Sequence, residues 1–515
     1  MKAKNPEFWK EVREKDCYKR IREELLALWE EYGADKPIPV LRYSEFKQFW
    51  VTGNRGNYET PYFRKRQGMN CSALLSLIYP EEEKYLNRLM DHIYTMLGDR
   101  LEPLIRHRIE AEVQRRIIAP FTAVENYGWW EVGKSNWTAV CMGSVACTVM
   151  LMRPELYESI RPRVERSMET YLSGFKADGI CEEGCAYWHY GFGFFVVWAD
   201  MLRTFTDGAA DYFKRDHVRT IAGFIQKMFL SGNASVGFAD GGRSVRYHLG
   251  LVHYLKNEYP DYVTVYDPKY SYNYDGCARF CLYLRSLLWQ DEEVYHHPAD
   301  NENRDYYAPE TQWFVRRTSA YGFAAKGGHN AEMHNHNDVG SFVFAKNGRQ
   351  VLMDQGPGVY SRQYFSGERY KKVECSSRGH SVPLIGGETQ FTGRDAAARD
   401  SRFENGVFTT DIAGAYKCPA LTSLVRSFSF TEQTVTLTDT YTLTEELPVT
   451  ERIVTLLKPE LPEAGVAVVE DVTVRYDPAV CDAEIGEEKK DNGAVCYFLN
   501  FRLHPGVRTF TCEIQ

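Results

Sequence analysis

The sequence has no apolar stretch long enough to span a bilayer, because its longest apolar run, near Phe192 to Leu202, is short and interrupted. The first fifteen residues contain no apolar core, so the sequence as given carries no signal peptide. We therefore expect a cytoplasmic protein without a membrane partner, and a periplasmic or secreted one if a leader has been removed.

Paired cysteines, phosphate-binding loops and an excess of positive charge are missing as well. The thirteen cysteines are scattered and odd in number, which argues against a disulfide framework and favours reduced thiols. Neither Gly-x-Gly-x-x-Gly nor a Walker sequence occurs, so the chain has no phosphate-cradling cofactor motif. The formal net charge of −8 gives no general attraction to nucleic acid, and a polyanionic substrate would have to meet a local basic patch.

What the sequence does have is size and a helical period over its first part. Its 515 residues exceed the length at which a single core keeps growing, so we expect two or more domains. Apolar residues recur at intervals of three and four from Tyr18 through Ile21, Leu25 and Leu28, which predicts an amphipathic helix. Similar patterns fill roughly the first 290 residues, at 81–97, 102–118, 137–152, 154–173, 187–205 and 211–230.

Beyond Gln312 the period changes to the alternation that is typical of strands. Residues 435–443 and 466–474 alternate apolar and polar side chains, with Gly, Pro and Asn turns between such runs. Helices followed by strands predict an α+β fold, with a helical domain at 1–300 and an antiparallel β domain at 301–515. Stacked helical hairpins close into a ring or form a bundle, and the period does not distinguish the two.

The densest group of candidate functional residues lies in the segment 327–344, which holds three of the thirteen histidines. If this segment is extended, the period of two places His334 and His336 on one face of a strand. Asp354 and His380 follow within fifty positions. His336, Asp354 and His380 would suit a divalent ion such as zinc, with an open or water-filled fourth position. The alternative is a surface or hydrogen-bonded histidine pair.

Two stretches of the helical half also carry chemistry. Residues 122–137 are rich in aromatics and amides, and Asn136 near their end opens a helix. The alternative for Asn136 is a cap-like structural role. Residues 177–191 contain Tyr187 and Tyr190, three apart and hence on one helical face. The alternative for this pair is two aromatic core residues.

The order of these motifs resembles the heparinase II/III-like polysaccharide lyases, a superfamily that includes alginate lyases. The resemblance rests on His-x-His-Asn-Asp-x-Gly-Ser-Phe from His334, on Asp354 before Gly, and on Ser-x-x-His ending at His380. It implies a helical (α/α) toroid followed by an antiparallel β-sandwich. It also implies that His334 is catalytic and that His336, Asp354 and His380 hold a metal, with zinc preferred to manganese or calcium.

The resemblance extends to the helical half. It implies that Asn136 contacts a uronate carboxylate and that Tyr187 is the catalytic tyrosine, with Tyr190 as the alternative one turn later. Many relatives have a histidine after the asparagine, whereas this chain has Trp137, which removes one candidate base. The expected substrate-binding residues are Trp137, Glu183, Trp188, Arg378 and Arg115.

The function implied by the resemblance is β-elimination of polysaccharides that contain uronic acids, most of all glycosaminoglycans, to 4,5-unsaturated products. Alternatives are an alginate or other polyuronate lyase, a catalytically silent carbohydrate-binding relative, and a metal-dependent hydrolase. The expected partner is an acidic polysaccharide or oligosaccharide, and association into a homo-oligomer stays open.

Overall fold

The computed structural model describes residues 2–33, 36–53, 55–89, 105–125, 127–244, 247–266, 270–271, 276–299 and 303–515. Internal contacts divide the chain into two compact units. The helical unit comprises residues 1–174, 189–219 and 246–300, and the β unit comprises residues 175–188, 220–245 and 301–515. Within the described ranges, none of the helices combines the length and the apolar character needed to cross a membrane.

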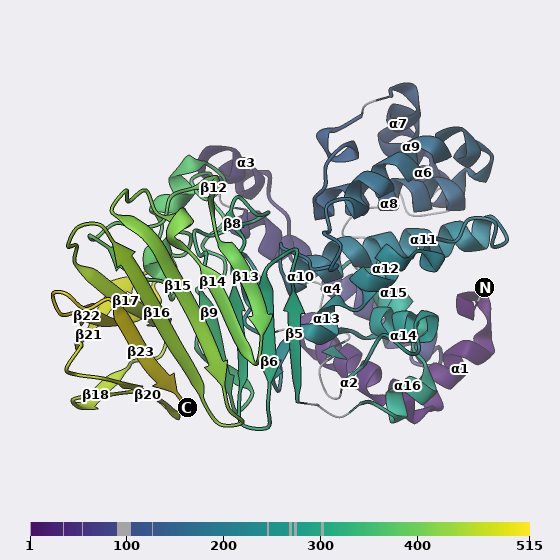
Figure 1. The fold of residues 1–515 in the computed structure, drawn as a ribbon. Helices are drawn as coiled ribbons and strands as arrows, with labels where there is room; N and C mark the ends of the chain where they lie inside the picture. Colours follow the sequence, from purple (N-terminus) through teal and green to yellow (C-terminus); the bar gives the residue numbers. More distant parts are fainter. Residues whose placement is uncertain are drawn as a thin grey trace. The chain divides into compact units, whose positions relative to one another are not determined.

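The helical unit is built from helices that pack on neighbours in the chain (Figure 1). α2 (Lys19–Leu28) buries Ile21, Leu25 and Leu28, as the period of the sequence predicts. α8 (Asn136–Met152) packs on α9 (Pro154–Leu172), and α14 (Leu249–Glu258) packs on α15 (Phe280–Trp289). The other α-helices of the described chain are α1 (Pro6–Glu14), α3 (Tyr43–Thr52), α4 (Gly56–Ile78), α6 (Ile105–Val113), α7 (Ala119–Ala123), α10 (Cys185–Tyr187), α11 (Gly193–Phe205), α12 (Asp216–Ala222), α13 (Phe224–Lys227) and α16 (Glu292–His296).

Two of the predicted helices are interrupted. The predicted helix at 187–205 contains a π-helical turn, Trp188–Phe192, between α10 and α11. The predicted helix at 211–230 ends in strand β1 (Phe229–Ser231), which pairs with β2 (Ala234–Ser235). Phe229 and Leu230 are buried in the β unit, so tertiary packing overrides local propensity here. Residues 90–97 and 102–104 of two further predicted helices lie outside the described residues.

Three antiparallel sheets form most of the β unit (Figure 1). Their strands are β5 (Arg304–Ala308), β6 (Trp313–Arg317), β7 (Gly322–Lys326), β9 (Phe342–Lys346), β10 (Arg349–Leu352), β11 (Leu384–Ile385), β13 (Arg399–Glu404), β14 (Val407–Asp411), β15 (Leu421–Phe430), β16 (Val435–Leu443), β17 (Val449–Thr455), β18 (Glu460–Glu463), β19 (Val466–Val469), β20 (Val472–Tyr476), β21 (Cys481–Lys489), β22 (Val495–Leu503) and β23 (Thr509–Ile514). The strand orders are β10-β9-β7-β6-β5, β11-β17-β22-β21 and β13-β14-β15-β16-β23-β20-β19-β18. Smaller pairs join β12 (Gly393–Ala397) to β8 (His329–Asn330), and β3 (Tyr247–His248) to β4 (Tyr270–Ser271) in the helical unit.

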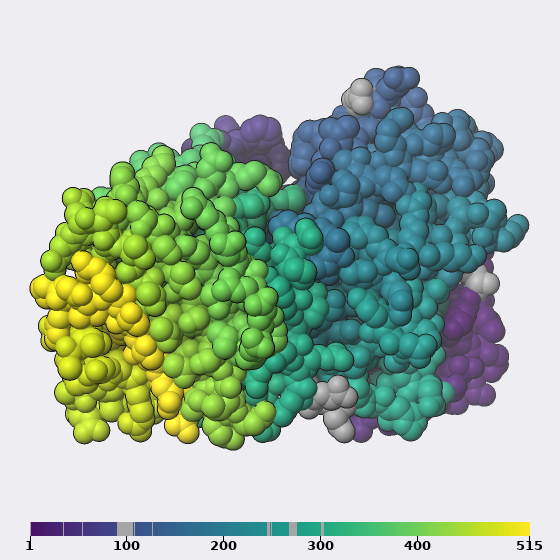
Figure 2. Space-filling model, viewed as in Figure 1, coloured from purple at the N-terminus to yellow at the C-terminus, as the bar shows by residue number. Residues whose placement is uncertain are grey.

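Side chains from all three sheets meet in one core. Phe323 of β7 lies 4.9 Å, between ring centroids, from Phe428 of β15, and Phe501 of β22 lies 5.2 Å from Phe510 of β23. The yellow C-terminal residues lie at the surface in Figure 2, in keeping with the alternation of buried and exposed side chains along β23. The β unit therefore consists of sheets packed face to face, as a sandwich requires.

The predicted strand at 435–443 coincides with β16, whereas the predicted strand at 466–474 is a hairpin. β19 and β20 pair directly, from Val469 opposite Val472, and the turn between them places Glu470 at a φ of 51°. The buried residues are Ala467 and Val469 in β19, and Val472 and Val474 in β20, so the inward face shifts by one position across the turn. The predicted single strand with one continuous period of two is therefore wrong at the two-residue turn.

Two segments from the helical half of the sequence belong to the β unit. Asp178 accepts hydrogen bonds from the backbone N–H of Thr311, at 2.7 Å, and from its hydroxyl, at 2.9 Å. β1 packs on the five-stranded sheet so closely that a Cβ on Gly322 would lie 2.4 Å from the carbonyl carbon of Leu230. The predicted division at residue 300 does not anticipate these two segments, which carry Glu183, Tyr187 and Asp240.

Candidate active site and metal centre

His334 lies in a loop of the β unit. β8 ends before the histidine pair and β9 begins after it, and His334 has a φ of 56°, in the left-handed region. The prediction that His334 and His336 share one face of a strand is therefore wrong. The two imidazoles are brought together by another residue, Asp240, which the sequence reasoning missed.

The carboxylate of Asp240 contacts both histidines. Its Oδ2 lies 2.7 Å from Nδ1 of His334, and its Oδ1 lies 3.2 Å from Nε2 of His336. Tyr360 donates a hydrogen bond of 2.9 Å to Oδ2, and Tyr364 donates one to Oδ1. The sequence signal for Asp240 was weak: an Asp-Gly-Gly turn after a short apolar run.

Tyr187 packs directly on His334. The two rings are nearly parallel, at 25°, with centroids 4.4 Å apart, and the Tyr187 hydroxyl lies 2.6 Å from that of Tyr360. Oε2 of Glu183, a buried residue, lies 3.5 Å from Nε2 of His334. The His334 side chain keeps 21% of its exposure, so a phenol and an imidazole in contact are both available to a ligand.

Hydrogen bonds keep the central carboxylate charged. Burial alone would raise the pKa of Asp240, but the contacts with His334 and His336 outweigh burial and hold that pKa far below its usual range. Burial, and then the negative charge of Asp240, raise the pKa values of Tyr360 and Tyr364. Both tyrosines therefore act as neutral donors to Asp240 near neutral pH.

His336, Asp354 and His380 form a compact donor set. One ligand atom from each lies within 4.8 Å of the other two, and all three residues are buried. Nδ1 of His336, Nδ1 of His380 and Oδ2 of Asp354 have no hydrogen-bond partner of good geometry, which is costly for buried polar atoms, and the last two of these atoms lie 3.2 Å apart. The other ring nitrogens are held by Asp240 and, at 3.0 Å, by the carbonyl of Glu374. Histidines whose non-ligating nitrogens are held by hydrogen bonds in this way are suited to bind a divalent ion, and two imidazoles with a carboxylate suit zinc.

Three predicted residues lie together in the helical unit. Asn136 is buried at the first position of α8, and Trp137 contacts the ring of Tyr190 edge-on at 6.5 Å. Gly191 permits this packing, since a Cβ there would lie 3.0 Å from Cα of Asn136. Arg279 donates a hydrogen bond of 3.1 Å to the Tyr190 hydroxyl.

The expectation that Tyr187 and Tyr190 share a helical face is wrong, because the π-helical turn begins directly after Tyr187. The two hydroxyls accordingly have different partners, Tyr360 for the first and Arg279 for the second.

The other predicted substrate-binding residues are already engaged. Trp188 is fully buried and donates from Nε1 to the carbonyl of Ile221 at 2.9 Å, so its assignment to a ligand surface is corrected to the core. Arg378 pairs with Glu488 at 3.0 Å, and Arg115 pairs with Glu112 at 2.7 Å. The binding roles of the two arginines stay predictions.

The loop that carries His334 is anchored by a buried ion cluster that the sequence reasoning also missed. Nζ of Lys326 lies 2.8 Å from a carboxylate oxygen of Glu332 and 2.8 Å from one of Asp338, and all three side chains are fully buried. Burial raises the pKa of Glu332 to about 7, against the opposing charge of Lys326. One lysine thus ties together both ends of the segment around His334.

We expect Lys326→Met to lower the free energy of unfolding by about 3–5 kcal/mol, because it leaves two buried carboxyl groups without their cation. Urea unfolding followed by circular dichroism measures the change. Lys371→Met is the matched control, since that lysine is 75% exposed and, among the described residues, forms its ion pair with Glu368 within its own turn. A loss for Lys326→Met no larger than the control's, within about 0.5 kcal/mol, would show that the cluster adds nothing to stability.

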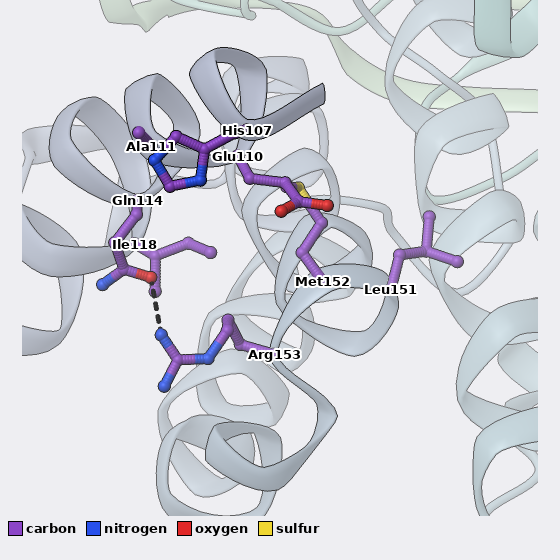
Figure 3. Close-up of a pocket in the computed structure, with 8 residues that line it drawn as sticks. All are labelled: His107, Glu110, Ala111, Gln114, Ile118, Leu151, Met152 and Arg153. Carbon is purple, nitrogen blue, oxygen red and sulfur yellow. Dashed lines mark hydrogen bonds between the residues drawn. The ribbon is translucent and has the colours of Figure 1, made fainter. Parts of the chain in front are cut away.

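A cavity of about 520 Å³ lies in the helical unit, between α6 with its π-helical continuation (Gln114–Ile118) and the end of α8 (Figure 3). Arg153 crosses it and donates a hydrogen bond of 2.9 Å to Gln114. The eight residues that line this cavity include none of the predicted site residues. The chemistry of the histidine cluster therefore lies elsewhere in the chain.

Comparisons with known proteins concern the family and the fold of the chain. Residues 306–509 match the family described as heparinase II/III-like, C-terminal. The sequence matches no curated protein.

Among solved structures, the chain is similar to heparinase III, with a TM-score of 0.57 and 12% identity over 89% of this chain and 77% of that one. It is also similar to a heparan sulfate lyase HepC mutant from Pedobacter heparinus, with a TM-score of 0.54 and 13% identity over 96% of this chain and 72% of that one. These similarities confirm the predicted fold class of helical toroid and antiparallel β-sandwich. His334 and all three candidate metal ligands thus lie within residues 306–509, the part of the chain that matches the heparinase II/III-like C-terminal family.

Proposed function

We propose that the protein is a polysaccharide lyase that cleaves acidic polysaccharides next to a uronic acid, with glycosaminoglycans as the preferred class. The observation that carries the proposal is the contact between Tyr187 and His334, whose rings stack at 4.4 Å while both side chains stay partly exposed. A phenol and an imidazole side by side are suited to moving protons at neighbouring positions of a sugar.

The proposed reaction is a β-elimination. A base removes the proton from C5 of the uronate, the electron pair forms the C4=C5 double bond, and the C4–O bond breaks. The leaving oxygen takes a proton from an acid, which balances the reaction without water. Tyr187 and His334 share these two proton transfers, and each is worth about 10²–10⁴ in rate.

The C5 proton becomes acidic only when the neighbouring carboxylate is neutralised. Asn136 is assigned to this role, because an amide that donates to the carboxylate stabilises the charge that develops during proton removal. Trp137 and Tyr190, which pack together beside Asn136, are assigned to contact the sugar ring.

The donor set His336, Asp354 and His380 is assigned to a structural divalent ion, with zinc preferred to manganese or calcium. When bound, the ion would hold together three segments that are far apart in the sequence. Burial of all three ligands favours this role over a metal-dependent hydrolase, whose ion must be open to substrate and water.

Incubation with hyaluronan, chondroitin sulfate, heparan sulfate and alginate tests the proposal, with product followed by the ultraviolet absorbance of the unsaturated uronate. We expect absorbance to rise with at least one glycosaminoglycan, faster than with alginate. New reducing ends without a rise in absorbance would identify a hydrolase, and binding without cleavage would identify a silent relative.

A further inference from the structure

We propose that Asp240 is a positioning residue that sets the orientation of His334 and at the same time holds the metal ligand His336, so that one carboxylate links the metal centre to the catalytic histidine. The catalytic part of this inference rests on the proposed function. The structural part does not, because it concerns only the two imidazoles and Asp240.

Each carboxylate oxygen of Asp240 serves one histidine, Oδ2 for His334 and Oδ1 for His336. A carboxylate can only accept, so the ring nitrogen that faces it must carry a proton in both residues. The 2.7 Å hydrogen bond to Asp240 thereby fixes a proton on Nδ1 of His334. Nε2, which lies at the longer distance of 3.5 Å from Oε2 of Glu183, is left as the nitrogen that can exchange a proton with substrate. His336 is fixed with its proton on Nε2, which leaves the lone pair of Nδ1 pointing at Asp354 and His380.

The carboxylate is itself rigidly placed. Its side chain is fully buried, and Tyr360 and Tyr364 each donate to one of its oxygens. The turn that carries Asp240 is also closely packed against the chain at Gly184. A Cβ on Gly184, whose φ is 97°, would lie 2.8 Å from Cα of Gly241, the residue after Asp240. Asp240 is therefore held by its neighbours in a single arrangement that both histidines must match.

Arg369 supplies the nearest further positive charge. Its Nη2 lies 3.8 Å from Oδ1 of Asp240, and its guanidinium covers the ring of Tyr364 at 4.6 Å. Oδ1 of Asp240 therefore lies near a positive charge as well as near His336.

Asp240→Asn tests the inference with almost no change in size. An amide offers one accepting oxygen and one donating nitrogen, so it can satisfy only one of the two histidines in its present tautomer. We expect kcat to fall by about 10²-fold with KM changed less than about threefold, measured with zinc in excess. We also expect zinc affinity, measured by chelator competition, to fall by about tenfold, because His336 loses its outer partner.

Asp411→Asn is the matched control. The Asp411 carboxylate lies in the same unit and accepts from the backbone N–H of Ala413 and Leu424 and from the Ser423 hydroxyl, with no contact to the site. We expect this variant to change neither kcat nor zinc affinity. Equal losses in both variants would mean that Asp240 is merely structural.

Nitrogen-15 spectra of labelled histidines separate this inference from the proposed function, with His334→Gln and His336→Gln used for assignment. In the wild-type protein we expect His334 protonated at Nδ1 and His336 at Nε2, and at least one of these to change in Asp240→Asn. If these tautomers are found but the protein is inactive on every polysaccharide, the positioning role of Asp240 is supported and the proposed lyase function is refuted. An active protein with the opposite tautomers, or with kcat unchanged in Asp240→Asn, would overturn the positioning role alone. If Asp240→Asn fails to fold, the tautomers of His334 and His336 in the wild-type protein still test the positioning role of Asp240.

Discussion

Tyr187→Phe is expected to lower kcat by about 10³-fold while leaving the fold intact. The substitution removes one hydroxyl, which lies 2.6 Å from that of Tyr360, and keeps the ring that stacks on His334. The loss of one partly buried hydrogen bond changes stability by only about 1 kcal/mol, so rate and stability separate clearly. Steady-state kinetics on the best polysaccharide, with thermal unfolding of the same sample, measure both.

Tyr190→Phe is the matched control for this result. It also removes a single tyrosine hydroxyl, which accepts a hydrogen bond from Arg279 in the helical unit. We expect less than about a tenfold loss of kcat. The reverse order of the two losses would place the catalytic tyrosine at Tyr190.

Removal of a bound divalent ion is expected to lower the melting temperature first and activity as a consequence. An ion that binds only the folded state contributes about 4 kcal/mol when its concentration is 1,000 times Kd. The physical reason is the convergence of three buried ligand atoms that lack hydrogen bonds of good geometry. They are Nδ1 of His336, Nδ1 of His380 and a carboxylate oxygen of Asp354. Elemental analysis should find one ion per chain, and melting after chelation measures its contribution.

His380→Ala should reduce the metal count, whereas His504→Ala should not. His504 lies in the same unit, but it is partly exposed and faces Asp482 at 3.3 Å. Native protein without metal would refute the donor set as a metal site. Melting unchanged by chelation while activity vanishes would make the ion catalytic instead of structural.

The sequence predicted well those features that depend on local pattern. The amphipathic face of α2 and the alternation along β16 follow directly from the spacing of apolar residues, and the order of helices and strands set the fold class. The pattern failed where long-range packing decides, as at Phe229, which pairs in a strand although its neighbours form helices. It also failed at the turn between β19 and β20, since both sides of that turn keep their side chains in the core.

For the candidate site, residue types were easier to predict than geometry. The donor set His336, Asp354 and His380 and the pairing of Tyr187 with His334 were expected from motifs, and the structure brings both groups together. Asp240 was not expected, because a lone aspartate some ninety positions before the histidines carries only the weak local signal of an Asp-Gly-Gly turn. The loop conformation at His334 depends on the contacts of Asp240 and Lys326, which no periodicity encodes.

The assignment of residues 175–188 and 220–245 to the β unit has a consequence for how the chain folds during synthesis. These segments leave the ribosome before any of the strands on which they pack. They cannot make their native contacts until Thr311 and Gly322 have been synthesised. A fragment beginning at residue 301 would lack β1 and would expose the apolar face that Leu230 covers. Such a fragment would be prone to aggregate, so limited proteolysis should not release a stable β unit cut at that position.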